Sequence, residues 1–356
     1  MDRRTHPDDA VPGVGMISKG EPHPAHAGFG DAIGAERIPV APVGPPGTVL
    51  EDVLSAAGLL REGHHDVYLA EDAVGLYGAP LLARRGDSTF VLLVAMHRLT
   101  MEGYHLRPTA SPGESARWID RRLDVGLVRR LLNRYVDGVM AVSELTAETV
   151  RRIAPRMPVR VAEPYVQSAY YDRLQSVRPS LDGRTAVFVG VGRDHKGVDT
   201  LVEAWPTVRE RLPGARLRMV GGGRPDRYGR VEGVSCEGYV EHERLGEVFR
   251  DAALYVHPAR YDPFPIAPIE AMLAGVPAVV TTRTGTAPYV SDIEERLVVE
   301  PRPERLADAV TWYLQQDASY KRTVSGRMRE LARTFDERSR TDAFARRFAD
   351  LLSEIR

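Results

Sequence analysis

The segment HPARYDPFPIAPIEAMLAGVPAVVT, residues 257–281, carries two acidic residues, Asp262 and Glu270, eight positions apart. An ionised carboxylate accepts hydrogen bonds through two oxygens, so it can hold a pair of neighbouring hydroxyl groups. Two such carboxylates suit a site that binds a ribose and a hexose. Each acid also has a purely structural explanation. Glu270 could cap the start of its helix, and Asp262 could belong to a solvated turn.

The residues around this acidic pair predict the elements that position it. ALYVHP, residues 253–258, predicts a short buried strand, and PIEAMLAG predicts a helix that begins near Pro268 and ends at Gly275. VPAVVT, residues 276–281, predicts another strand of a parallel sheet that is covered on both faces. Doubly wound domains bind ligands at the carboxyl ends of their strands, so both acids fall at the ligand-binding edge.

Two cations precede a predicted helix farther upstream. TAVFVGVGRDHKGVDTLVEAW, residues 185–205, predicts a strand, a glycine-containing turn with Arg193 and Lys196, and then a helix. A helix amino terminus favours anions, so these cations would form a diphosphate site without a metal ion. The chain has only three lysines, Lys19, Lys196 and Lys321, which makes a lysine at this turn more informative. The alternative is a surface cation pair beside a turn.

Together these segments resemble the signature of the retaining nucleotide-sugar glycosyltransferases of family 4, which have the GT-B fold. The acidic motif of that family is Glu-x7-Glu, and this chain has Asp-x7-Glu. The resemblance implies that Glu270 binds the donor ribose and Asp262 the transferred sugar. It also assigns the donor diphosphate to Arg193 and Lys196.

Further donor-binding positions follow from the same resemblance. RLRMVGGG, residues 216–223, is similar to the second glycine-rich loop of the family, and Gly238-Tyr239-Val240 to a strand that often contacts the base. The donor-binding set that we expect is Arg193, Lys196, Glu270, Gly192, Gly222, Gly238, Tyr239, Phe264 and Ile266. The chain also departs from the family, because Thr286 and Tyr289 replace a glycine and an acid of a usual Gly-Gly-x-x-Glu segment.

Candidate acceptor-side residues lie in the first half of the chain. His97 follows the predicted strand LLVAM, where the family often has a histidine facing the transferred sugar, although a bare histidine can also be a packed loop residue. Ser143 ends another strand and could equally cap the helix after it. The stretch RWIDRRLDVGLVRRLLNRYV, residues 117–136, predicts a basic amphipathic helix that either lies on anionic lipid or presents a solvated face.

The predicted fold class is α/β, in the GT-B arrangement of two Rossmann-like doubly wound domains that face a cleft. An alternation of strands and helices over residues 14–98 predicts a compact parallel sheet, although KGEPHPAHAGFG replaces the usual first glycine-rich loop. We expect an N-terminal acceptor domain at 1–164 with disordered first residues, a hinge at 165–180, and a nucleotide-sugar-binding domain at 181–336. The helix at 337–356 is expected to return to the first domain.

The length, charge and cysteine content of the chain exclude several classes of protein. The chain has 356 residues, enough for two cores, and a net charge of -1, so no global field attracts nucleic acid. Its single cysteine, Cys236, excludes an internal disulfide framework and multi-cysteine zinc sites, and is best explained as a core residue. Apolar runs are too short to span a membrane and no signal-type segment follows the charged start. We expect a cytoplasmic protein, with peripheral contact at the inner face of a membrane as the alternative.

The resemblance thus implies a retaining glycosyltransferase that moves a hexose from a nucleoside diphosphate sugar to an acceptor hydroxyl, and the two cations predict that it is metal-independent. The catalytic residues that we expect are Asp262, His97, Arg193 and Lys196, with His97 and Ser143 toward the acceptor. A sugar-nucleotide epimerase or a phosphorylase could use the same scaffold. A non-catalytic glycosyltransferase-like binding subunit is a further alternative, which Asp262, Tyr289 and the short first domain motivate. The base, the sugar, the acceptor and the oligomeric state stay open.

Overall fold

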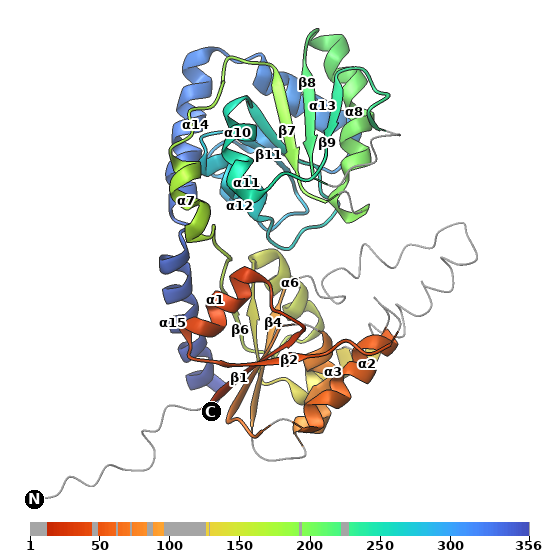
Figure 1. The fold of residues 1–356 in the computed structure, drawn as a ribbon, viewed down its shortest axis with the longest axis vertical. Helices are drawn as coiled ribbons and strands as arrows, with labels where there is room; N and C mark the ends of the chain where they lie inside the picture. Colours follow the sequence, from red (N-terminus) through yellow and green to blue (C-terminus); the bar gives the residue numbers. More distant parts are fainter. Residues whose placement is uncertain are drawn as a thin grey trace, which may run out of the picture. The chain divides into compact units, whose positions relative to one another are not determined.

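The computed structural model describes residues 13–44, 49–61, 63–71, 73–83, 88–95, 126–127, 129–191, 194–221 and 228–355 (Figure 1). The chain divides into two compact units. The first comprises residues 1–142, 146–162 and 341–356, and the second comprises residues 143–145 and 163–340.

A six-stranded parallel sheet forms the centre of the first unit. Its spatial order is β2-β1-β3-β4-β5-β6, so the chain reverses direction across the sheet between β1 and β3. The strands are β1 (Val14–Lys19), β2 (Glu36–Val40), β3 (Val67–Ala70), β4 (Thr89–Val94), β5 (Gly138–Ala141) and β6 (Val159–Val161). Most of these residues are buried, as expected for a parallel sheet covered by helices on both faces.

Helices cover this first sheet. They are α1 (Pro24–Ala32), α2 (Val49–Ala56) with the 3-10 helix η2 (Ala57–Arg61), α3 (Ala73–Leu82) and α6 (Glu144–Ile153). The C-terminal part of α15 (Glu337–Ile355) also belongs to this unit. There the Phe344 ring stacks on Phe29 with a centroid distance of 4.3 Å, and Leu351 packs over Gly138. The last helix therefore contributes to the core of the first unit.

The second unit contains a sheet of the Rossmann order, β12-β11-β10-β7-β8-β9, again wholly parallel. Its strands are β7 (Thr185–Val189), β8 (Arg216–Val220), β9 (Val234–Glu237), β10 (Leu254–His257), β11 (Ala278–Thr281) and β12 (Val298–Val299). The strand order reverses between β7 and β10, which are hydrogen-bonded neighbours. In such sheets the crevice at the carboxyl ends of these two strands binds the ligand.

Helices pack on both faces of the second sheet. They are α7 (Ser168–Gln175), α8 (Val198–Arg211), α10 (Leu245–Arg250), α11 (Ile266–Leu273), α12 (Ala287–Ser291), α13 (Pro303–Leu314) and α14 (Ala318–Arg333). Short 3-10 helices lie at η3 (Asp194–Lys196), η4 (His242–Arg244) and η5 (Glu295–Leu297). Figure 1 shows α8 and α13 side by side, and α11 packs against both α7 and α14.

The predicted fold class, two Rossmann-like doubly wound units, is confirmed. Two local predictions need correction. Helix α11 begins at Ile266 rather than near Pro268, because a proline is tolerated in the first turn, where its missing N–H breaks no helical hydrogen bond. Gly238-Tyr239-Val240 follows β9 instead of forming a strand. Within the described ranges, no helix has the length and the apolar character needed to cross a membrane.

Candidate active site

Two loops meet where the strand order of the second sheet reverses. The loop after β7 carries η3, and the loop after β10 carries residues 258–265. The backbone N–H of Arg260 donates to the carbonyl of His195 at 2.8 Å. Gly197 has a φ of 63°, and a Cβ atom there would lie 2.1 Å from the carbonyl oxygen of Pro258. Glycine is therefore required for this close approach, which brings Lys196 beside the acidic loop.

Lys196 and Asp262 form an ion pair where these loops meet. The Lys196 Nζ atom lies 2.6 Å from Oδ2 of Asp262, and Nε2 of His257 lies 2.8 Å from the same oxygen. Asp262 is only 4% exposed and His257 only 2%. The interpretation of Asp262 as a solvated turn residue is therefore wrong, because its carboxylate is buried between two nitrogen donors.

The protonation of this cluster follows from its contacts. Burial lowers the pKa of His257 more than the neighbouring Asp262 raises it, so the imidazole is neutral and donates its Nε2 proton to Asp262. Its Nδ1 atom then faces the Tyr255 hydroxyl, 3.2 Å away, whose proton is shared between this nitrogen and the carbonyl oxygen of Val189 at 3.3 Å. Burial alone would raise the pKa of Asp262, but Lys196 and His257 outweigh burial and lower it to about 2. Asp262 is therefore ionised at neutral pH.

The backbone fixes the direction of the Asp262 side chain. Its N–H donates to the carbonyl of Arg283 at 3.0 Å, and its carbonyl accepts from the N–H of Gly285 at 3.0 Å. A Cβ atom at Gly285 would lie 1.8 Å from the carbonyl oxygen of Pro263, so only glycine allows this contact. Among the described residues, Oδ1 of Asp262 has no hydrogen-bond partner, because both side-chain contacts go to Oδ2. That oxygen can accept a hydrogen bond from a ligand.

Glu270 lies on α11, the helix that follows the acidic loop. It is the fifth residue of the helix, past the first turn, so it does not cap the helix start. Its side chain is 5% exposed, and its Oε1 atom lies 2.6 Å from Nε2 of His242, whose side chain is 43% exposed. The ring of His242 stacks on Tyr170 of α7 with a centroid distance of 4.2 Å.

The other described residues of the predicted donor-binding set differ in their surroundings. Gly238 and Tyr239 follow β9, and Tyr239 is 77% exposed, which leaves its ring accessible to a ligand. Ile266 is the first residue of α11 and is half-buried. The ring of Phe264 is buried against Phe335, 5.6 Å between centroids.

Tyr289 stands where the resembled family usually has an acid. Its hydroxyl donates to Oε1 of Glu163 at 2.7 Å, and Nη1 of Arg340 lies 3.1 Å from the other oxygen of Glu163. Its ring packs edge-on against Phe335 with a centroid distance of 5.1 Å. Tyr289 therefore takes part in a network with Glu163 and Arg340, and its hydroxyl is used there.

Several predicted residues lie outside the described part of the chain. These are His97, Gly192, Arg193 and Gly222, together with Arg117, Arg121 and Arg122 of the basic stretch. Ser143 is described: it is buried between β5 and α6. Cys236 lies in β9, and burial raises the pKa of its thiol.

Sequence reasoning missed three polar groups at these strand ends. His257 ends a buried strand and also holds Asp262, and a histidine at the end of a buried strand is the signal that the sequence offers. His242 gave no signal, because its partner Glu270 is 28 residues away. In the first unit, Nδ1 of His26 lies 2.7 Å from Oε1 of Glu71, at the β1–β3 reversal of that sheet.

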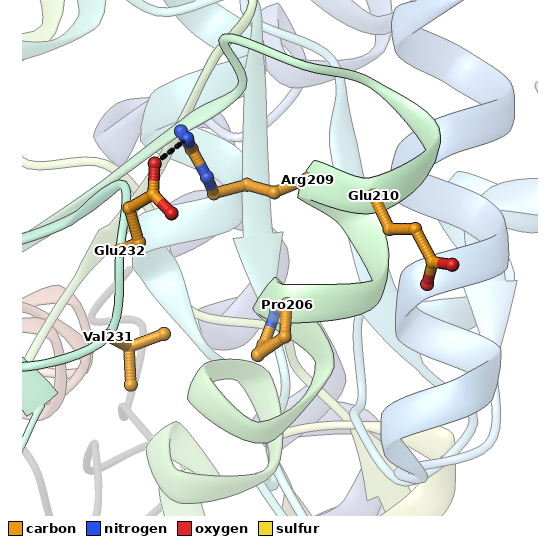
Figure 2. A pocket seen from close by; sticks show the side chains of 5 residues that line it. All are labelled: Pro206, Arg209, Glu210, Val231 and Glu232. Atoms are coloured by element: carbon orange, nitrogen blue, oxygen red, sulfur yellow. Dashed lines mark hydrogen bonds and ion pairs between the residues drawn. The ribbon is translucent and has the colours of Figure 1, made fainter.

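A surface pocket of the second unit lies at the opposite end of the sheet. Figure 2 shows its lining residues, Pro206, Arg209, Glu210, Val231 and Glu232, with Arg209 and Glu232 paired across it. Pro206, Arg209 and Glu210 lie in the C-terminal half of α8, and Val231 and Glu232 precede the amino end of β9. Ligands of doubly wound sheets bind at the carboxyl ends instead. This pocket is therefore not the candidate active site.

Comparison with known proteins agrees with the geometry. Residues 183–316 match the family described as Glycosyl transferases group 1. The mannosylfructose-phosphate synthase of Agrobacterium fabrum is 31% identical over 140 residues, which are 35% of this chain and 31% of that protein. The GDP-mannose-dependent alpha-(1-6)-phosphatidylinositol monomannoside mannosyltransferase of Mycobacterium tuberculosis is 28% identical over 259 residues, 64% of this chain and 65% of that protein. The chain thus spans less than two thirds of either relative.

The fold is shared with solved structures. HepE of Anabaena, in complex with UDP-glucose, superposes with a TM-score of 0.68 and covers 96% of this chain and 100% of its own. The two sequences are 16% identical, so this similarity is one of fold.

Proposed function

We propose that this chain, whose residues 183–316 match the group 1 glycosyltransferases, transfers a hexose from a nucleoside diphosphate sugar to an acceptor hydroxyl with retention of configuration. One observation carries the proposal: an ammonium and an ionised carboxylate, Lys196 and Asp262, lie together where the Rossmann sheet reverses its strand order. A diphosphate and a sugar ring need opposite charges close together. The crevice offers both.

The donor diphosphate would bind at Lys196 and at the amino end of α11. Within the described part of the chain, the first turn of α11 has no side-chain cap, so the N–H groups of Ile266 and Ala267 can donate to an anion. Arg193, three residues before Lys196 in the sequence, would add a second cation. These groups would stabilise the charge that develops on the departing diphosphate.

The sugar ring would lie on the other side of Lys196, against Asp262. As the bond to the diphosphate lengthens, the ring becomes positively charged, and a fixed anion stabilises that charge more in the transition state than in the ground state. His257 and Lys196 both contact Oδ2, which leaves Oδ1 for the sugar. The departing phosphate oxygen would accept the proton of the acceptor hydroxyl on the same face, which retains the configuration.

Glu270 would hold the ribose of the donor. A carboxylate can accept from both vicinal hydroxyls, and the Oε1 atom already accepts one hydrogen bond, from His242. The exposed ring of Tyr239 offers a stacking surface for the base. The names of relatives point to mannose and glucose donors: one is GDP-mannose-dependent and a structural neighbour was solved with UDP-glucose.

Donor hydrolysis and transfer test the proposal. The protein is incubated with UDP-glucose or GDP-mannose and a panel of hydroxyl acceptors, and release of the nucleoside diphosphate is measured with and without EDTA. Release is expected with at least one donor, undiminished by EDTA, and the product anomer should match the donor anomer by NMR. Nucleotide binding without any turnover would contradict the transferase assignment, and inversion would contradict the mechanism. Strict dependence on Mg²⁺ or Mn²⁺ would overturn the metal-free diphosphate site.

A further inference from the structure

The proposed mechanism leaves one contact of the nucleotide site unused. His242 covers the carboxylate of Glu270, with 2.6 Å between Nε2 and Oε1. Glu270 itself is nearly inaccessible, whereas the His242 side chain is half-exposed. The imidazole therefore occupies an acceptor site of this buried carboxylate that a ribose hydroxyl could use.

Two contacts hold the His242 side chain in place. Its ring stacks on Tyr170 of α7 at an interplanar angle of 25°, and its Nε2 atom faces Glu270 of α11. Glu243, next to it in η4, is the other acidic group that acts on it. Glu247 of α10, the remaining helix packed against η4, is paired with Arg244. The charged groups that act on the imidazole are therefore carboxylates, and they favour its protonated form.

The pKa shift of His242 agrees with this geometry. The hydrogen bond to Glu270 raises the pKa of His242 above its ordinary value and outweighs the lowering effect of burial. Without the nucleotide, an imidazolium at this position therefore persists to higher pH than that of a free histidine. The contact is then an ion pair that is screened on its solvent side.

We propose that His242 is a residue of the nucleotide site: it occupies the Glu270 carboxylate in the ligand-free chain and gives it up to the ribose hydroxyls when a nucleotide sugar binds. The inference rests on the proposed function, because it requires Glu270 to bind ribose. Exchange of an N–H donor for two O–H donors keeps the buried carboxylate satisfied in both states.

The exchange couples nucleotide binding to protons. In the free chain Glu270 holds the proton on His242, and in the complex that partner is lost, so the pKa of His242 falls toward its ordinary value. Binding therefore releases protons, and by linkage the affinity rises with pH until the free chain has also lost the proton. Partly exposed ion pairs contribute up to about 1 kcal/mol, so the affinity should rise about two- to fivefold between about pH 6 and pH 8.

Nucleotide sugars are used as ligands because they have no phosphate group that titrates in the same pH range as His242. A free nucleoside diphosphate has a terminal phosphate that titrates near pH 6, whereas the diphosphate of UDP-glucose or GDP-mannose is esterified at both ends. Affinity is measured by calorimetry with these two nucleotide sugars, at acid and mildly alkaline pH and in two buffers of different ionisation enthalpy. Wild type is compared with His242→Gln, which keeps an N–H donor and cannot titrate. His64→Gln, the same change at an exposed histidine of the first unit, is the control.

The predicted result is a pH-dependent affinity with proton release in wild type and His64→Gln, and a flat profile without proton release in His242→Gln. If His242→Gln keeps the wild-type pH dependence, the inference is wrong. Glu270→Gln separates this failure from failure of the proposed function, because unchanged nucleotide-sugar affinity in that variant would remove the ribose role itself. Absence of binding of either nucleotide sugar to wild type would overturn both. As a second measurement, the imidazole NMR signal of His242 is identified as the one that is missing in His242→Gln. This signal should titrate with a pKa above the ordinary value, and the pKa should fall when the nucleotide sugar binds.

Discussion

The two acids of the donor site are held in different ways, although they lie eight residues apart and are equally buried. Asp262 is fixed by the buried His257 and by Lys196, and its backbone is hydrogen-bonded on both sides. Glu270 has the half-exposed His242 as its partner. A partner that is buried cannot leave, whereas one that meets solvent can exchange with a ligand.

This difference matches the tasks that we propose for the two carboxylates. A group that stabilises charge in a transition state has to be oriented before the reaction, because reorganisation would raise the barrier. A group that binds and releases a nucleotide in each cycle can have an exchangeable partner instead.

The largest effect is expected from Lys196→Met. Turnover should fall about 100- to 1,000-fold, the usual cost of removing one charge-stabilising donor. The variant also leaves Asp262 with His257 as its only side-chain partner among the described residues. Turnover is measured per folded molecule, after the melting temperature of each variant is known.

Lys321→Met is the matched control for this variant. Lys321 is a buried lysine of α14 whose Nζ atom donates to the carbonyl of Leu314 at 2.8 Å, near the amino end of β7 and not at the carboxyl ends of the strands. It should lower stability and leave turnover per folded molecule unchanged. Similar losses of turnover in the two variants would show that Lys196 acts through folding.

A smaller effect is expected from His257→Leu, which removes the positioning donor of Asp262. Turnover should fall about ten- to 100-fold, since a small misplacement of a catalytic group has costs of this order. The dissociation constant of the nucleoside diphosphate should not change, and the comparison of the two readouts separates positioning from general destabilisation. Tyr255→Phe removes the next hydroxyl in the chain of hydrogen bonds and should have a weaker effect in the same direction. An unchanged turnover in His257→Leu would remove the positioning role.

The smallest effect concerns stability in acid. The pKa of Asp262 in the folded chain is about 2, below its ordinary value of 3.8. The ionised group therefore contributes stability that is complete above about pH 4 and is lost as the pH falls toward 2, with a size of about 2 kcal/mol. Denaturant unfolding of wild type and Asp262→Asn at several pH values should show a difference that shrinks over this range. A constant difference would mean that the Asp262 carboxylate has no such depressed pKa.

The sequence predicted the elements of the second unit well, because their signals are local. The run before Pro258, the helix around Glu270 and the glycine-containing turn that carries Lys196 depend on neighbouring residues. Partners that are distant in sequence were not predictable in this way. Tyr289 contacts Glu163 across 126 residues, and nothing in the local sequence of either residue indicates the other. The roles of His97 and Arg193 stay predictions, since both lie outside the described residues.

The most direct test of the account is the affinity of a free nucleoside diphosphate for two variants, measured by calorimetry with UDP and GDP. Glu270→Gln should weaken binding by about 1 to 3 kcal/mol, because a charged partner of the ribose hydroxyls is lost. Asp262→Asn should bind at least as tightly as wild type, because Lys196 then has no anionic partner in the described part of the chain and is released to the diphosphate. Equal losses of nucleotide affinity in both variants would contradict the division of roles between the two acids.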